Sequence, residues 1–130
     1  MQGNIYTINT NKKGLPDCMT KKGDTDILVI SVDSGHIVEQ IQLEDIITDK
    51  KNSQCKFLHC DGVRLYISDL GLNVVYVMEL IGENEGVVKS FGKTGKRPGQ
   101  FKDVAGIAAD TDGNVLIVDA CNNRIQVWYL

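Results

Sequence analysis

Short apolar runs separated by turn residues dominate the chain. Within these runs the residues alternate between apolar and polar or are apolar throughout, whereas the spacing of an amphipathic helix is nearly absent. Runs rich in Ile, Val and Tyr are typical of β-strands, so the pattern predicts an all-β chain. The predicted strands are Asn4–Ile8, Ile27–Val32, Ile37–Ile41, Leu65–Ile67, Val74–Met78, Val87–Phe91, Val104–Ala109, Val115–Val118 and Ile125–Tyr129, with a weaker one at 57–60.

A turn followed by a strand recurs three times, as GNIYTIN, DGVRLYISD and DGNVLIVD. The Asp-Gly pairs at 61–62 and 112–113 predict tight reversals, because an Asp-Gly pair readily supplies the positive φ values that such turns need. The turn glycines at 3, 62 and 113 lie 59 and 51 residues apart. In the second and third copies an Asn follows the strand-ending Asp by four residues. Blades of β-propellers repeat every 40–50 residues or so, and a polar stretch such as Thr10–Asp26 would lengthen one of them.

Composition narrows the choices further. The 130 residues have a net charge of -3, with 42% hydrophobic and 24% charged residues, which is ordinary for a globular domain. The first residues do not resemble an export signal, and apolar runs such as Ile27–Ile30 are far too short to span a bilayer. The four cysteines form no Cys-x-x-Cys pair. We therefore expect reduced thiols, a cytoplasmic location, no metal and no other cofactor.

The run VVKSFGKTGKRPGQFKDVAGIAADTDGNVLIVDACNNRIQVW resembles the NHL repeat of β-propellers. It contains an FG pair, a Gly-x-x-Pro-Gly-x-Phe loop, a DGN hairpin, an Asp-terminated strand and Asn-x-Arg-Ile-Gln-Val. The second copy is similar but has Val74 where Arg is usual. The resemblance implies a partial NHL-type β-propeller with about three four-stranded antiparallel blades, at about 1–43, 55–91 and 104–130, the first and last incomplete.

An incomplete ring of blades leaves sheet faces uncovered, because each blade buries its faces against its neighbours. Closed propellers of this family are expected to have about six blades. We therefore expect either that the chain is a piece of a longer protein, the alternative we favour, or that it pairs with a second protomer. In both cases other blades complete the ring.

Alternate connections of a four-stranded meander lie on the same rim of a propeller. This predicts that the connections Asp69–Asn73, Gly92–Asp103 and Asp119–Arg124 lie together. Some basic residues of these connections have an alternative role: the lysines could merely keep the exposed loop soluble, and Arg124 could pair with Asp119 or with an adjacent blade. The candidate partner-binding residues on this rim are Lys93, Lys96, Arg97, Lys102, Asn122, Asn123 and Arg124.

The resemblance implies three classes of function. The first is a non-catalytic platform that binds a protein, such as the substrate-recognition module of a tripartite-motif ubiquitin ligase. The second is a propeller that binds single-stranded RNA in post-transcriptional regulation, although few aromatic residues are available for stacking. The third, which we consider weakest, is a fragment of a lyase or lactonase with a metal in its channel. For the aspartates among the candidate metal ligands, the alternative role is to cap turns. The candidate metal ligands are few: His36, His59, Asp69, Asp110 and Asp119.

Overall fold

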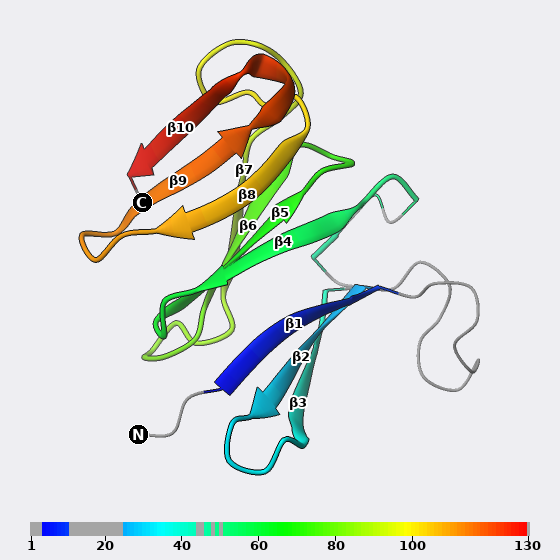
Figure 1. Cartoon of the computed structure of the whole chain (residues 1–130), viewed down its shortest axis with the longest axis vertical. Coiled ribbons are helices and arrows are strands. Elements are labelled where there is room, and N and C mark those ends of the chain that lie inside the picture. The colour runs from blue at the N-terminus through cyan, green and yellow to red at the C-terminus, as the bar shows by residue number, and fades with distance from the viewer. Residues whose placement is uncertain (1–3, 11–24, 44–45, 48, 50, 130) are drawn as a thin grey trace. The chain divides into compact units, whose positions relative to one another are not determined.

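The structure is a computed structural model that describes residues 4–10, 25–43, 46–47, 49 and 51–129. The chain divides into two compact units, residues 1–51 and 52–130. The described residues form ten strands in three antiparallel sheets and one short 3₁₀ turn. Figure 1 labels the strands in chain order. The prediction of an all-β chain is therefore confirmed. No helix in this described part is long and apolar enough to cross a membrane.

The first unit contains a three-stranded meander. Its strands are β1 (Asn4–Thr10), β2 (Thr25–Ser31) and β3 (Ile37–Gln42), in the order β1-β2-β3 (Figure 1). Ile27 and Val29 on β2 are buried, as expected for alternate positions on one face of a strand. Most of the predicted polar insertion between β1 and β2 lies outside the described residues.

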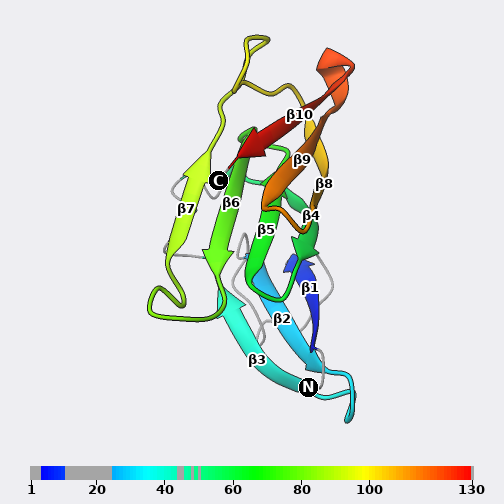
Figure 2. The ribbon, with the colours of Figure 1, turned by 90° about the vertical axis from the view of Figure 1, so that its left-hand side faces the viewer.

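The second unit begins with a four-stranded sheet. Its strands follow one another in the order β4-β5-β6-β7 (Figure 2). They are β4 (Cys55–Cys60), β5 (Arg64–Asp69), β6 (Val74–Glu79) and β7 (Val88–Phe91). The weak strand predicted at 57–60 is thus a full partner of β5. The two central strands are buried along most of their length, which explains their continuous apolar runs.

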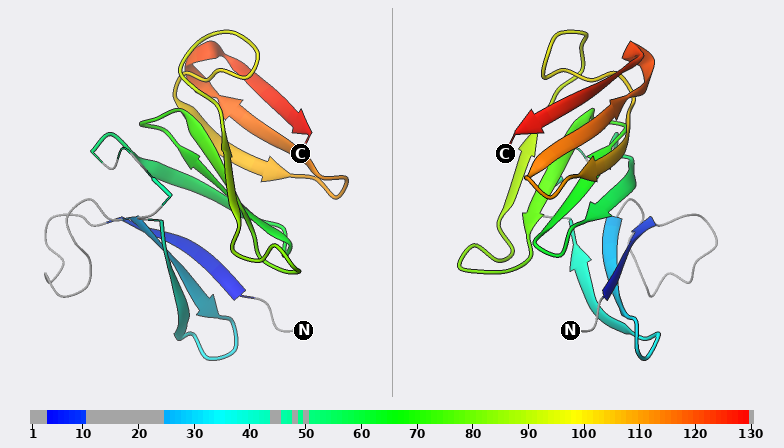
Figure 3. Two further views of the ribbon diagram at one scale, coloured as in Figure 1. Left: turned by 180° about the vertical axis from the view of Figure 1, so that it is seen from behind. Right: turned by 60° about the vertical axis from the view of Figure 1, so that its left-hand side comes forward.

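A three-stranded sheet completes the second unit. It comprises β8 (Val104–Ala109), β9 (Asn114–Asp119) and β10 (Arg124–Tyr129), with the 3₁₀ turn η1 (Ala120–Asn122) between the last two strands. β8 lies next to β4 and β5, and Figure 3 shows the two sheets side by side. One buried cluster joins the sheets and is the core of this unit: Tyr66, Val75, Val77, Phe101, Val104, Val115 and Ile117.

The two predicted Asp-Gly turns are present, but only the glycine of each pair has a positive φ, and not both residues as expected. Gly62 and Gly113 have φ values of 87° and 86°, while the preceding aspartates keep negative φ. Asp61 contributes its carboxylate, which accepts the amides of Val63 and Arg64 at 2.9 and 2.7 Å. Glycine therefore provides the backbone conformation, and a side-chain acceptor fixes the turn.

Candidate binding rim

Three connections meet at one edge of the second unit: residues 69–73, 92–103 and 119–124. We call this edge the rim. Asn73, at the end of the first connection, ties it to the second: its Nδ2 donates to Thr94 Oγ1 at 3.1 Å, and its Oδ1 accepts the amide of Val104 at 3.1 Å. The prediction that these connections lie together is confirmed within this unit.

The Asn that recurs four residues after each strand-ending Asp has a backbone role. Asn73 has φ 54° and Asn123 has φ 52°, both in the left-handed region. Asparagine tolerates this conformation better than most residues other than glycine. In the η1 turn the amide of Asn123 donates to the carbonyl of Ala120 at 3.2 Å. The repeated Asn therefore reverses the chain before β6 and before β10.

The loop 92–103 is folded onto a buried aromatic side chain. Phe101 is fully buried, and its amide donates to the carbonyl of Lys93 at 2.8 Å. Its ring lies 6.0 Å from the ring of Trp128, which in turn lies 4.2 Å from Phe91. Gly92, at φ 101°, is so close to the Phe101 ring that a side chain would collide with it. The Gly-x-x-Pro-Gly-x-Phe segment thus forms a fixed loop anchored by its phenylalanine.

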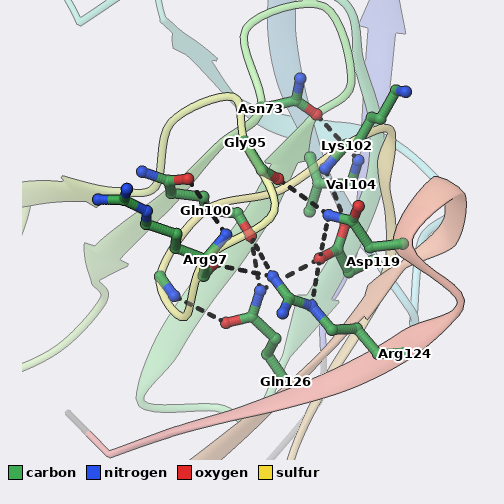
Figure 4. A network of polar contacts seen from close by, with 11 residues as sticks. Asn73, Gly95, Arg97, Gln100, Lys102, Val104, Asp119, Arg124 and Gln126 are labelled. Atoms are coloured by element: carbon green, nitrogen blue, oxygen red, sulfur yellow. Dashed lines mark hydrogen bonds and ion pairs between the residues drawn. The ribbon is translucent and has the colours of Figure 1, made fainter.

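The carboxylate of Asp119 is the centre of the rim. It is fully buried and accepts four hydrogen bonds (Figure 4). Its Oδ1 accepts the amide of Lys102 at 2.7 Å. Its Oδ2 accepts Arg124 Nε at 2.8 Å, Asn122 Nδ2 at 2.9 Å and Gln126 Nε2 at 3.2 Å. A buried carboxylate needs this many hydrogen-bond donors, because removing an unpaired charge from water is unfavourable.

The same donors also hold the backbone of the loop. Arg124 Nη2 donates to the carbonyls of Arg97 and Gln100, each at 2.9 Å, and Gln126 Nε2 donates to the carbonyl of Gln100 at 2.7 Å (Figure 4). Gln126 Oε1 accepts the amide of Gly99 at 3.1 Å. The guanidinium fork therefore connects the Asp119 carboxylate to two loop carbonyls, which one ammonium group could not do with the same geometry.

Burial by itself would raise the pKa of Asp119. The opposing contributions are the hydrogen bonds from the Lys102 amide and from the side chains of Asn122, Arg124 and Gln126, and they hold the pKa below its usual value. Asp119 is therefore ionised at neutral pH, and the surrounding hydrogen-bond donors stabilise this ionised form. Protonation would weaken every contact that the carboxylate makes.

The seven candidate residues separate into two groups. Arg124 pairs with Asp119, which confirms the alternative reading of that arginine, and Asn122 Nδ2 is shared between Asp119 Oδ2 and the carbonyl of Gly95 at 2.9 Å. These two side chains therefore support the loop from within. The remaining candidates are exposed on the rim: Lys93, Lys96, Arg97, Lys102 and Asn123.

The preceding repeat contains an equivalent buried carboxylate with different donors. Asp69 Oδ1 accepts the amide of Gln54 at 2.8 Å, as Asp119 accepts that of Lys102. Asp69 Oδ2 accepts Ser53 Oγ at 2.5 Å and Tyr76 Oη at 3.1 Å. Because Val74 replaces arginine in this repeat, hydroxyl groups replace the guanidinium.

Cys55 is buried next to the Asp69 carboxylate. Burial, together with the neighbouring Asp69, raises the pKa of Cys55 to about 12. Cys55 and Cys60 are free thiols, as is the exposed Cys121, whose pKa is raised by its hydrogen bond to Asp103. Cys18 lies outside the described residues.

Asp110, another of the metal-ligand candidates, has a structural role in a turn. Asp110 Oδ1 accepts the amides of Asp112 and Asn114, each at 2.9 Å, and its pKa is lowered chiefly by the Asn114 side chain. The turn-capping alternative is thus confirmed for Asp110, as it is for the two buried aspartates. Among the described residues, no group of three or more His, Cys, Asp or Glu side chains is placed to hold a metal ion.

Sequence reasoning missed the part played by Gln126. The signal was the alternation along β10, where Arg124, Gln126 and Trp128 are half-buried and the residues between them are exposed. A polar residue in register with a core tryptophan needs partners, and this points to a buried polar network.

The family comparison coincides with this network. Residues 101–128 match the family model of the NHL repeat. The match begins at the buried Phe101, ends at Trp128 and includes Asp119 and its side-chain donors. A search of the curated proteins gives no match to the chain. Together with the meander sheets, the repeat confirms the predicted fold class, an all-β partial NHL-type β-propeller.

Proposed function

We propose that the chain is a non-catalytic binding module that recruits a protein partner through the rim. NHL repeats typically act as binding modules. The observation that carries the proposal is the construction of the loop 92–103: its carbonyl groups are bound from below by Arg124, Gln126 and Asn122. Four cationic side chains are left exposed on a fixed backbone, which lowers the entropic penalty of binding.

The charge distribution of the second unit is uneven. The rim presents Lys93, Lys96, Arg97 and Lys102, with Asp103 as the exposed acid of the same loop. The turns β4–β5, β6–β7 and β8–β9 lie at the other ends of these strands (Figure 2). They contain exposed acidic residues: Asp61, Glu83, Glu85, Asp110 and Asp112. The unit is thus electrically polar along its strands. This favours an acidic peptide or an acidic protein surface as the partner of the rim, because complementary potentials guide association.

RNA binding is the second candidate, since the same cations would attract phosphates. The burial of the aromatic side chains at and beneath the rim favours a protein partner over RNA. Phe101 is fully buried, and Trp128 is half-buried beneath Gly99 and between Phe91 and Phe101. Unspecific recognition of single strands relies on exposed rings on which bases stack. The described part of the rim offers no such exposed ring.

On the resemblance stated above, we further propose that this module recognises substrates for a cytoplasmic ubiquitin ligase of the tripartite-motif type. The blades would select the partner, and ubiquitin transfer would take place elsewhere in the assembly. A test is to fuse the chain to an active RING domain and to search for ubiquitinated proteins that depend on the rim. Substrates that remain unchanged when the four rim cations are replaced would contradict the ligase role.

The binding proposal is tested by anisotropy with two labelled probes, a polyglutamate peptide and a single-stranded polyuridine RNA. The test variant replaces all four cations by glutamine (K93Q/K96Q/R97Q/K102Q). The control variant, K56Q/K89Q, neutralises exposed lysines on β4 and β7. We expect the polyglutamate peptide to bind the wild type and the control equally, and the test variant about tenfold more weakly.

Three other outcomes of this experiment would contradict the binding proposal. Salt-sensitive binding of polyuridine with no binding of polyglutamate would replace the protein proposal by the RNA alternative. Equal binding of polyglutamate to the test and control variants would show that the rim is not the binding surface. If neither probe bound, the proposal that the cations of the rim attract a partner would be refuted.

A further inference from the structure

One face of the β8–β10 sheet is apolar and exposed. On β9 this face contains Leu116 and Val118, each 38% exposed, and on β10 it contains Ile125 and Val127, which are 63% and 51% exposed. The register pairs Val118 with Ile125 and Leu116 with Val127, so the four side chains form one block. We call these four residues the tail face. A continuous apolar block of this kind on two neighbouring strands indicates an interaction surface.

The equivalent positions in the preceding sheet show what such a face binds. Counting back from Asp69 as from Asp119, they are Tyr66 and Ser68 on β5, paired with Val77 and Val75 on β6. All four are at most 5% exposed. They are covered by the next sheet of the chain, through Phe101, Val104, Val115 and Ile117. Ser68 Oγ also donates to the carbonyl of Ala105, at 2.7 Å. The tail face therefore repeats a surface that another sheet of the same kind buries in this molecule.

The sheet of the first unit has the other half of such an interface. In the β8–β10 sheet the covering residues Val115 and Ile117 lie four and two positions before Asp119. Four and two positions before Asn9, the residue aligned with that Asp, are Ile5 and Thr7. Their partners on β2 are Ile30 and Leu28. We call Ile5, Thr7, Leu28 and Ile30 the head face; Ile5 is 53% exposed, and the other three are half-buried.

We propose that the tail face of one copy docks on the head face of a second copy of this chain. Both halves of the interface belong to one sequence, and neither half contains a charged residue, so a second copy supplies the matching surface without a buried charge. The contact continues the packing of sheet on sheet already present within the second unit. It is heterologous, so two copies close if each tail meets the other's head, and otherwise the copies form a growing chain.

This inference is independent of the binding role of the rim, because it concerns the sheet faces and not the rim loops. The measurement is the molar mass of the full chain by light scattering after gel filtration, from micromolar to near-millimolar concentration. We expect association of the wild type, and monomers for V127K on the tail face and for I5K on the head face. The control I81K changes an equally exposed isoleucine, 56% exposed, between β6 and β7, and it should associate like the wild type.

Mixing the two monomeric variants provides the decisive result. V127K retains an intact head face and I5K an intact tail face, so an equimolar mixture should contain heterodimers although neither variant associates alone. A monomeric wild type at every concentration would overturn the proposal. So would association that I5K leaves unchanged, which would indicate tail-to-tail contact, or a mixture that stays monomeric. Unchanged circular dichroism of each variant would show that the substitutions at these exposed positions leave the fold intact.

Discussion

Replacing Asp119 by asparagine tests the network on which the rim depends. The substitution keeps the shape of the side chain and removes the charge. An asparagine has one oxygen, and it retains more hydrogen bonds if that oxygen takes the position of Oδ2, facing Asn122, Arg124 and Gln126. Its amide group then faces the backbone N–H of Lys102, which loses its acceptor.

The size of the expected loss in the free energy of unfolding follows from these contacts. A hydrogen bond to a charged group contributes about 1.5–3 kcal/mol and a neutral one about 0.5–1.5, so each of the three retained bonds weakens by about 1 kcal/mol. The unsatisfied Lys102 amide adds a further loss of about 1–3 kcal/mol. Since such contributions are not additive among neighbours, we expect a total loss of about 3 kcal/mol in the free energy of unfolding.

The assay is urea unfolding followed by the fluorescence of Trp128, the one tryptophan of the chain. Its ring packs against Phe91 and Phe101, so the signal reports on the unit that contains Asp119. The matched control is D112N, the same chemical change at an exposed turn position of the same sheet. It should change the free energy of unfolding by less than about 0.5 kcal/mol.

The pH dependence provides a second criterion. The pKa of Asp119 is lowered in the folded state, so its contribution to stability is fully present above the ordinary carboxyl pKa of about 3.9 and is lost as the pH falls through the lowered value. The difference between wild type and D119N should therefore be constant at neutral pH and narrow in acid. A D119N variant as stable as D112N, or a difference that does not narrow in acid, would refute the reasoning.

Three further predictions concern single residues. Gly113→Val should lower the free energy of unfolding by about 1–2 kcal/mol, because the site has open space but φ is 86°; an unchanged urea midpoint would contradict the turn assignment. Arg124→Lys should lower it by about 1–3 kcal/mol, because an ammonium group cannot reproduce the fork, whereas wild-type stability would show that charge alone suffices. Cys55 should resist iodoacetamide in the native chain at pH 8 while exposed Cys121 reacts, as peptide mass spectrometry would show; equal labelling would contradict the burial of Cys55.

Much of the fold could be predicted because strands leave a local trace in the sequence. Alternation and β-branched residues marked nearly every strand, and the boundaries differ by at most two residues at the strongly apolar segments. The exception is β4, whose CKFLHC sequence contains no β-branched residue and does not alternate clearly between apolar and polar positions.

The rim was harder to predict, because its contacts join residues far apart in the sequence. The spacing of Asp and Asn in the repeats correctly marked the connections, and the Arg124–Asp119 pair was an explicit alternative. The sequence did not show that Gln126 binds both the carboxylate and the loop carbonyl of Gln100. That arrangement depends on the loop returning over β10, which no local pattern encodes.

The most direct test of a cationic rim held in place by Asp119 is a map of backbone amide chemical shifts during titration with an acidic peptide. The account predicts that the shifts concentrate in residues 92–103 and 119–124, and that they become much smaller at the same peptide concentration when the four exposed cations are replaced by glutamine. Shifts centred on the opposite edge, at the turns 61–63, 80–87 and 110–113, or spread evenly over both edges, would contradict it.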